Sequence, residues 1–465
     1  MNSVWQNYTP TAKVGKLCYH LCSKQSVLPL RDVLNDQGEN FKPEPNYETA
    51  TYNWCTWCNQ ISVHSAVKDS LSHILFITKY YGQKREYLWR YFIVGYYEIG
   101  WVTQVDTSTV TQVGTRTAIR AKRMCFVPIE KAYEVTDERW KRINPKSKTL
   151  KLKNLRQATQ RIEKKLLDEI IENLNMGDAT DDFLYETARL KSEHNPFDSI
   201  PPSGRIFIIN VGANTTSPLQ SPVFDDGRFE FVPISEDAAP KDSNKILSFA
   251  DLRQFNYPDQ PFLALYPKAS VSPGDKVHND PEFLTFTYGD YTNKKSNLQD
   301  IRKGDYLFFL ARLVPFSDTQ LHYKQPFFAL VGYLEIDEVL NDPNSPLFTS
   351  PAFVRNAHVR RWLAKPASFD NFSVFKGSTE SRRFRYAVRF DRKFVENVPL
   401  LKADGGMWDW DRTTELGVIG SYTRTVRMYI DPKSKDGQEQ AEKFWRYICE
   451  AQKWNVPGKN QKAQC

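Results

Sequence analysis

The feature that most constrains the fold of this chain is a strand-like sequence that occurs twice. Tyr91–Ile99 reads YFIVGYYEI and Phe328–Ile336 reads FALVGYLEI, so the two segments share Val, Gly, Tyr, Glu and Ile. Each follows another apolar run, at Ile74–Lys79 and at Tyr306–Ala311. β-branched and aromatic residues dominate all four runs and favour strands. The repetition predicts two related β modules, and a chance likeness between two short hydrophobic strands is the alternative.

The remaining sequence predicts an α+β protein, and its 465 residues are enough for about three domains. Between 205 and 430, β-rich runs that include Phe229–Val232 and Phe262–Leu265 follow one another without regular intervening helices. This pattern favours an antiparallel sheet or a small barrel over a doubly wound parallel sheet. We expect a β module at 1–145, a basic helical connector with a Pro-rich linker at 146–204, a second β-rich domain at 205–437, and a terminal helix with a tail at 438–465.

A basic amphipathic helix is predicted between Leu150 and Leu174, where apolar residues recur at steps of three and four. Between 116 and 165 the chain has 16 Lys and Arg against 5 Asp and Glu, an excess larger than the net +8 of the whole chain. Such a local positive field attracts polyanions such as nucleic acid, and an ordinary solvated helix face is the alternative. Arg156, Lys164 and Lys165 are the candidate phosphate contacts on this helix.

Composition limits the class of protein further. With 40% apolar, 14% aromatic and 25% charged residues, the chain has the composition of a globular protein and not that of a disordered one. It has no run of the roughly 20 apolar residues that a membrane-spanning helix needs. Its first thirty residues also lack the apolar core of a signal peptide. We therefore expect a cytoplasmic protein.

The spacing of the cysteines suggests a metal site. Cysteines in a cytoplasmic protein stay reduced, so seven of them do not indicate a disulfide framework. Two close pairs occur, Cys18 with Cys22 and Cys55 with Cys58. Four thiolates would complete the tetrahedral shell of a structural Zn²⁺. The alternative is that these thiols are small buried hydrophobes in an aromatic core.

Basic and aromatic residues interleave most densely in the second module. Arginine offers planar donors for phosphate or guanine, aromatic rings stack on bases, and a Gly-Ser-Thr turn at 377–379 could bind an anion. A surface charge network is the alternative interpretation. The candidate nucleic-acid contacts are Arg360, Arg361, Trp362, Tyr333, Lys376, Ser378, Arg382 and Arg383.

Recognised catalytic motifs are absent from the sequence. It contains no GxGxxG, GxxxxGK[ST], HExxH or GxSxG. Glu335 lies beside aromatic residues on the repeated strand, where a ring can stack on a base while the carboxylate accepts a hydrogen bond from the exocyclic amine of that base. A glutamate that points to water at the edge of the sheet is the alternative. The candidate acid–base residues are Glu335, His358, Asp226 and Asp290.

Four segments resemble the third class of nucleotide-modification-associated domains. They are NVGAN with SPVFDDGRFEFVPISED inside 205–237, DPEFLTFTYG at 280–289, KGDYLFFLAR at 303–312 and GSTESR at 377–382. The GDYLFF and VGYxEI strands are also similar to those of the PUA-like group, which includes ASCH and EVE domains. The resemblance covers about half of the chain, up to residue 430. It implies a prokaryotic or phage setting linked to modified nucleobases and, for PUA-like domains, base recognition in a small β-barrel.

These observations lead to one principal hypothesis and two alternatives. The principal hypothesis is a protein of two PUA-like β-barrel modules that binds nucleic acid, DNA ahead of RNA, or a nucleotide. The binding would serve base modification or the recognition of modified bases. The first alternative is an enzyme that acts on a nucleotide or nucleobase. The second is a scaffold subunit of a DNA modification or defence complex.

Overall fold

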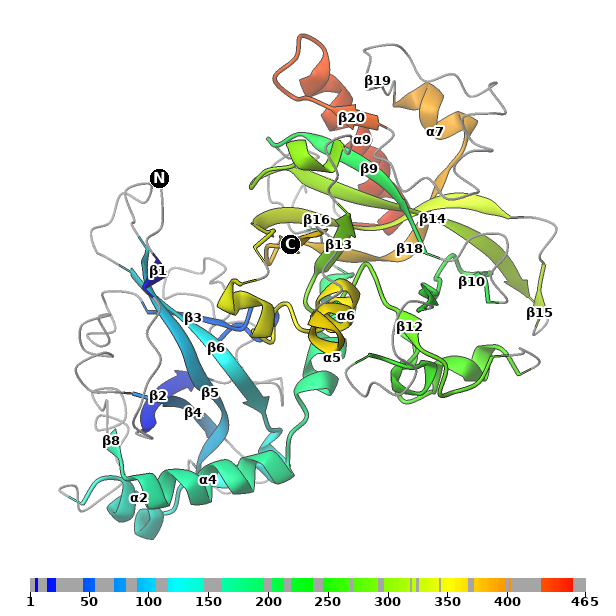
Figure 1. Ribbon diagram of the computed structural model, residues 1–465. Coiled ribbons are helices and arrows are strands. Elements are labelled where there is room, and N and C mark those ends of the chain that lie inside the picture. Colours follow the sequence, from blue (N-terminus) through cyan, green and yellow to red (C-terminus); the bar gives the residue numbers. More distant parts are fainter. Residues whose placement is uncertain are drawn as a thin grey trace, which may run out of the picture. The chain divides into compact units, whose positions relative to one another are not determined.

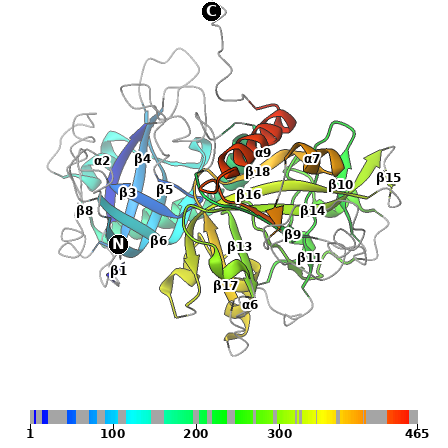
Figure 2. The ribbon, with the colours of Figure 1, turned by 90° about the horizontal axis from the view of Figure 1, so that it is seen from above.

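The computed structural model of the chain forms two compact units, each built around a sheet (Figures 1 and 2). The first unit comprises Met1–Leu184 with Thr349–Ala352, and the second comprises Tyr185–Phe348 with Phe353–Cys465. No helix in the described residues is long and apolar enough to cross a membrane. The structure describes residues 5–6, 15–21, 45–54, 71–80, 90–105, 116–145, 161–193, 195, 203–212, 219–236, 246–267, 271–291, 297–317, 320–322, 326–342, 344–366, 372–398, 401–402 and 428–454.

A mixed sheet forms the first unit. Its strands lie in the order β3-β6-β5-β4-β2-β8, with β1 and β7 both paired to β5. β2 runs parallel to β4, and the other neighbours on this path are antiparallel. The strands are β1 (Trp5–Gln6), β2 (Gly15–Leu21), β3 (Thr51–Trp54), β4 (His73–Tyr80), β5 (Arg90–Val105), β6 (Arg116–Phe126), β7 (Tyr133–Glu134) and β8 (Arg161–Ile162).

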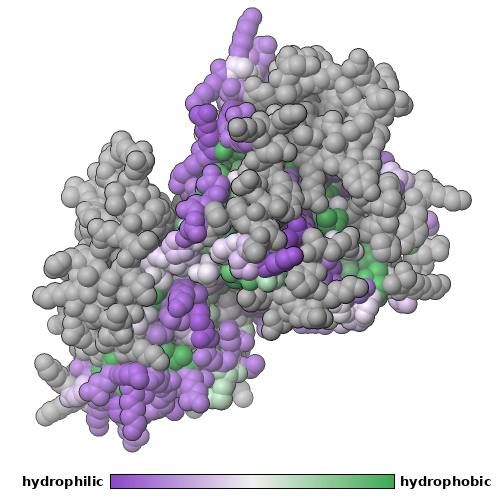
Figure 3. Space-filling model, viewed as in Figure 1, coloured by the Kyte–Doolittle hydropathy of each residue, from purple (hydrophilic) through white to green (hydrophobic). Residues whose placement is uncertain are grey.

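Helix α4 (Lys164–Met176) closes the core of the first unit. Its apolar residues Leu166, Leu167, Ile170 and Leu174 are buried in one cluster with residues of β4, β5 and helix α2 (Asp137–Ile143). This confirms the predicted apolar stripe from Leu166 onward and the helix end at Gly177. The predicted helix start at Leu150 is wrong, because Arg161–Ile162 pairs with β2 as strand β8 and the helix begins at Lys164, while residues 150–160 lie outside the described residues. The described outer face of α4 is mixed in charge and hydrophilic (Figure 3): its exposed charged residues are Glu163, Lys164, Lys165, Asp168, Glu169 and Glu172.

The second unit has a larger sheet of the same kind. Its strands lie in the order β13-β17-β16-β14-β9-β20-β19, with β18 paired to β16, and β10 and β15 paired to β14. β9 and β10 run parallel to β14. The strands are β9 (Ile206–Val211), β10 (Ser221–Phe224), β13 (Thr287–Tyr291), β14 (Tyr306–Ser317), β15 (Gln320–Leu321), β16 (Phe327–Leu340), β17 (Phe372–Gly377), β18 (Arg382–Phe390), β19 (Leu401–Lys402) and β20 (Met428–Ile430).

Smaller elements complete the second unit. β11 (Ile234–Ser235) and β12 (Val277–His278) form a separate two-stranded sheet. Helix α9 (Gly437–Gln452) buries Phe444 and Trp445 against Phe308 and Tyr333, which confirms the predicted terminal amphipathic helix. The other helices are α6 (Ala357–Ala364) and α7 (Arg392–Asn397), with 3-10 turns at Phe249–Asp251, Phe262–Leu265 and Asn297–Asp300. Helix α5 (Thr180–Lys191) and the 3-10 turn Pro346–Thr349 each contain a boundary between the units, after Leu184 and after Phe348.

The two units repeat one strand arrangement. The path β3-β6-β5-β4-β2-β8 matches β13-β17-β16-β14-β9-β20 position by position, including the single parallel pair, and β7 and β18 occupy equivalent places off the path. Register repeats as well, because Gly95 pairs with Phe76 and Gly332 pairs with Phe309, with the register shifting directly after each phenylalanine. The two related β modules inferred from the sequence therefore share topology and register.

The likeness extends to the turn before the first antiparallel strand. The sequences at 45–52 and 281–288 read PNYETATY and PEFLTFTY. In each, the second residue and the seventh form an isolated β-bridge, and the sixth has a positive φ, 51° at Ala50 and 52° at Phe286. The third residue is aromatic and lies over the repeated strand: a Cβ added at Gly95 would meet Tyr47 at 2.5 Å, and one at Gly332 would meet Phe283 at 2.7 Å. The repeated glycines therefore make room for this aromatic side chain and for a backbone oxygen, that of Cys125 at Gly95 and that of Arg382 at Gly332.

Several expectations about the fold need correction. Neither sheet closes into a barrel over the described residues, and both are mixed where a purely antiparallel sheet was expected, because β2 and β9 each run parallel to a central strand. Phe262–Leu265 forms a 3-10 turn, since Pro261 precedes it and its apolar residues pack into a local cluster. Phe229–Val232 contributes one isolated bridge and no strand.

Candidate functional site

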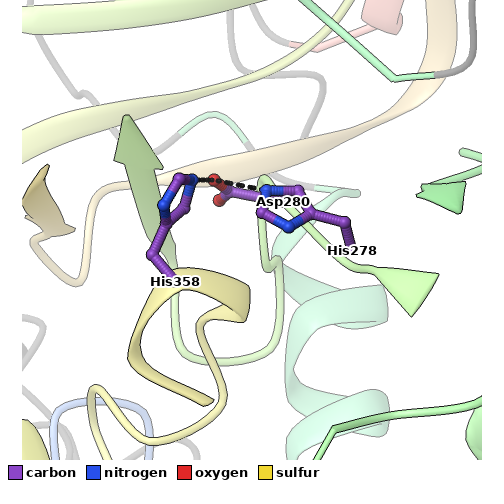
Figure 4. Close-up of side chains that lie close together, drawn as sticks. All are labelled: His278, Asp280 and His358. Atoms are coloured by element: carbon purple, nitrogen blue, oxygen red, sulfur yellow. Dashed lines mark ion pairs between the residues drawn. The ribbon is translucent and has the colours of Figure 1, made fainter. Parts of the chain in front are cut away.

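Three metal-ligating side chains meet in the second unit. His278 ends β12, Asp280 follows two residues later, and His358 lies in the first turn of α6. One ligand atom of each lies within 4.8 Å of the other two, and all three residues are buried. Asp280 Oδ2 is 3.6 Å from His358 Nε2 and 3.9 Å from His278 Nε2, so the carboxylate stands between the two rings (Figure 4).

Asn356 joins two of these residues. It is the N-cap of α6, and its Oδ1 accepts hydrogen bonds from the backbone N–H of His358 and Val359. Because the cap fixes which way the amide points, Nδ2 faces the other way and donates to Asp280 Oδ1 at 3.2 Å. One side chain therefore starts the helix that carries His358 and holds the carboxylate that His358 faces.

Strand β13 supplies the wall of the site at Gly289. The backbone N–H of Gly289 donates to Asp280, 2.9 Å from Oδ2. A Cβ added there would lie 2.5 Å from His358 Cδ2 and 2.9 Å from Asn356 Oδ1. Only glycine at this position lets the imidazole pack directly on the strand while the same residue binds the carboxylate.

The protonation pattern of His278 is set by Glu236. Its Nδ1 lies 2.8 Å from Glu236 Oε2, and Arg361 donates to both oxygens of the same carboxylate. Burial alone would raise the pKa of Glu236, but the hydrogen bond and charge of His278, together with Arg361, lower that pKa to about 2. The ionised Glu236 can only accept, so His278 Nδ1 carries the hydrogen.

This pattern favours a cation between the three ligands. With Nδ1 donating to Glu236, the His278 ring presents Nε2 to the Asp280 carboxylate, which only accepts, so a second proton on the ring or a metal ion must lie between them. Two buried acceptors that face each other are stable when a proton or a metal ion lies between them. A metal-binding histidine commonly donates its other ring N–H to a carboxylate, and His278 and Glu236 have this arrangement.

The types of ligand in this group limit which metal ions it could bind. Two imidazole nitrogens and one carboxylate oxygen suit a divalent transition metal such as zinc or iron. Three protein ligands leave at least one coordination position for water or substrate, whereas structural zinc sites have four. The donor set therefore fits a catalytic metal, which would supply Lewis-acid or redox chemistry at that position.

The site lies within a recognisable domain. Residues 205–404 match the family model of nucleotide modification associated domain 3. The three candidate ligands, with Glu236, Asn356 and Arg361, all fall inside the matched nucleotide modification associated domain. No curated protein and no solved structure shows a significant similarity to the chain.

The other acid–base candidates lie in separate clusters. Asp226 is exposed in a turn and pairs with Arg228 at 2.5 Å. Buried Asp290 accepts from Tyr288, 2.8 Å away. Glu335 accepts from Ser378 and from the Tyr306 hydroxyl. Of the four, only His358 belongs to the metal-ligating group.

Most of the candidate nucleic-acid contacts make internal interactions. Tyr333 is fully buried and donates to Glu380 O, and buried Arg382 donates to Thr379 O. Arg383 lies between the rings of Phe229 and Phe255, 3.6 Å from Glu230, and burial lowers its pKa to about 10. Lys376 is also buried, Arg360 bonds Arg355 O, Arg361 holds Glu236, and Trp362 packs on Phe348.

Some of the predicted phosphate contacts and zinc ligands lie outside the described residues. Lys164 and Lys165 are exposed on α4, whereas Arg156 lies outside the described residues. Cys22, Cys55, Cys58 and the side chain of Cys18 also lie outside them, so the cysteine zinc site stays a prediction.

Sequence reasoning missed His278 and Asp280. Their HxD spacing is a usable signal, because alternate residues of an extended segment point to the same side.

Proposed function

We propose that the chain binds a divalent transition metal at His278, Asp280 and His358 and uses it to modify a nucleotide or a base in nucleic acid. The observation that carries the proposal is the buried two-histidine, one-aspartate group with a ligand-atom spread of 4.8 Å. The match to nucleotide modification associated domain 3 supports a nucleotide or a base as the substrate class. The proposal favours the enzyme over the pure binding protein and the scaffold, because neither needs an incompletely filled metal shell.

The residues around the metal ligands would have defined tasks. His278, Asp280 and His358 would hold the ion, and Asn356 and Gly289 would orient the Asp280 carboxylate. The metal would polarise or activate the group bound at its open position. Burial of all three ligands limits the access of bulk water to that position.

Metal analysis of the purified full-length chain tests the first half of the proposal. We expect about one equivalent of transition metal that depends on His358, so that His358→Ala loses it. His322→Ala is the matched control, because this histidine bonds Ser317 outside the group. Equal metal content in the wild type and in His358→Ala would refute the site.

Nucleoside analysis tests the second half. DNA and RNA from cells that express the chain are digested and compared by mass spectrometry with those from cells that express His358→Ala. We expect a modified nucleoside, or the loss of one, in the wild-type sample alone. The proposed reaction would be contradicted if the wild type were folded and metal-loaded but its cells had the same nucleosides and the same nucleotide pools as cells that express His358→Ala. That result would leave the metal site itself in place.

Nucleic acid, DNA ahead of RNA, is the proposed partner. Strand β6 contributes exposed Lys122 and Arg123, and α4 contributes exposed Lys164 and Lys165. Nearby acids reduce this field, since Glu98 lies 3.9 Å from Lys122 and Asp168 lies 3.8 Å from Lys164. We expect binding whose affinity falls steeply with salt, and salt-independent binding would count against phosphate contacts.

A further inference from the structure

We propose that Glu236, held by Arg361, is a positioning residue that sets the metal affinity of the His278–Asp280–His358 group. The inference rests on the proposed metal site and adds two residues to it. Glu236 faces the side of the His278 ring that points away from Asp280, so it acts through His278 and not on the metal itself.

Local structure brings Glu236 beside His278. β11 and β12 pair antiparallel, with Ile234 opposite His278 and Ser235 opposite Val277. The ladder continues through a hydrogen bond from Glu236 N to Lys276 O at 2.9 Å. The two-stranded sheet therefore carries both partners, and the Glu236 side chain, 1% exposed, reaches His278 Nδ1 at 2.8 Å.

Arg361 fixes Glu236 from a third element. Its Nη2 lies 2.7 Å from Oε1 and 2.9 Å from Oε2, and its Nε lies 3.3 Å from Oε2. A guanidinium that contacts both oxygens leaves the carboxylate one orientation. Arg361 lies three residues after His358 on α6, so both side chains share one face of the helix.

Helix α6 therefore acts on both histidines. It supplies His358 directly, and through Arg361 and Glu236 it sets the ring orientation and tautomer of His278. An ionised acceptor at Nδ1 keeps the Nε2 lone pair directed at the metal position and makes it a better donor. Without the Glu236 carboxylate at Nδ1, the His278 ring can turn or place its hydrogen on Nε2, and either change weakens the ligand.

Cobalt(II) titration of the full chain tests this inference. We expect Glu236→Gln to raise the Kd for Co²⁺ by about 10- to 100-fold and to alter the d–d absorption of the bound ion. Arg361→Lys keeps the charge but loses the two-oxygen contact, so it should show a smaller shift of the same kind. Glu236→Asp should recover part of the affinity.

Glu230→Gln is the matched control. Glu230 is also a buried acid of the second unit, and it pairs with Arg383 at 3.6 Å, away from the metal ligands. We expect it to reduce thermal stability but to leave both the Co²⁺ Kd and the spectrum unchanged. A role of Glu236 in stability alone would make the two variants behave alike.

The outcomes separate this inference from the metal site itself. Wild-type Co²⁺ affinity and spectrum in folded Glu236→Gln and Arg361→Lys would overturn the positioning role while leaving the metal site in place. Failure of the wild type to bind Co²⁺ would overturn both. Should Glu236→Gln not fold, Arg361→Lys decides, because its side chain is 20% exposed and tolerates substitution better.

Discussion

Single residues decide whether the metal-ligating group can form. Gly289 is one of them, because its hydrogen atom stands where a methyl group would overlap His358. Glu236 is another, because its charge selects the tautomer of a histidine that it contacts on the far side from Asp280. Neither residue would bind a metal, and neither carries a motif that sequence reasoning selects.

Gly289→Ala should weaken metal binding. The added Cβ would lie 2.5 Å from the imidazole of His358, so the ring must move and its Nε2 leaves the group. We expect a loss of Co²⁺ affinity of at least about 10-fold in a chain that still folds. Gly274→Ala is the control, because its Cβ would meet only Ser272 Oγ at 4.0 Å. Unchanged Co²⁺ binding in Gly289→Ala would show that His358 does not need its observed place.

The thiols of Cys125 and Cys449 should resist alkylation at pH 8. Burial, assisted by Glu450, raises the pKa of Cys449 to about 12, and burial with Asp178 raises the pKa of Cys125 well above its usual range. Three pKa units correspond to about a thousand-fold smaller thiolate fraction, and the thiolate is the reactive form. Peptide mapping should find both cysteines unlabelled in the native chain and labelled after unfolding. Equal labelling in both states would contradict this burial.

At the scale of elements, α6 is the part on which the site depends most. It begins at a cap that also bonds Asp280, carries His358 in its first turn, and places Arg361 on Glu236 one turn later. The other side consists of His278 at the end of β12, Asp280 in the segment after it, and Gly289 in β13. The site is therefore a junction of one short helix with two separate strands.

Asn356→Ala tests this dependence. Loss of a helix cap costs about 0.5 to 2 kcal/mol, and Asp280 loses a donor as well. We expect a lower melting temperature together with at least about 10-fold weaker Co²⁺ binding. Thr136→Ala removes the cap of α2 in the first unit and should lower stability alone. If Asn356→Ala behaved like Thr136→Ala, the cap would have no role in the site.

At the scale of the whole molecule, one strand arrangement occurs twice, and among the described residues the metal-ligating group lies in the second copy. Aligning PNYETATY with PEFLTFTY places Asn53 at the position of Gly289, Glu44 at that of Asp280 and Lys42 at that of His278. A Cβ at position 289 would overlap His358, and the sequence of the first copy has no glycine, aspartate or histidine at the three aligned positions. The shared topology fixes a scaffold and not a site.

The duplication therefore predicts one such metal per chain. After alkylation of the reactive cysteines, which removes any thiolate site, the wild type should bind about one equivalent of Co²⁺ and His358→Ala none. Equilibrium dialysis with metal analysis measures both. One equivalent retained by alkylated His358→Ala would show that the first unit has a site of its own.

The sequence alone determined the local elements and the repeat. Periodicity located α4 and α9, and the VGYxEI echo predicted two related modules, because apolar spacing and strand composition act over short stretches of chain. Whether a sheet closes into a barrel, whether neighbouring strands run parallel, and which residues form the metal-ligating group depended on contacts between residues that are distant in the sequence. His278 and Asp280 are about 80 residues from His358, and their HxD spacing does not indicate which distant residue joins them. Only the tertiary structure brought these ligands together. Their proximity depends on how β12, β13 and α6 pack against one another, and the sequence of no single element determines that packing.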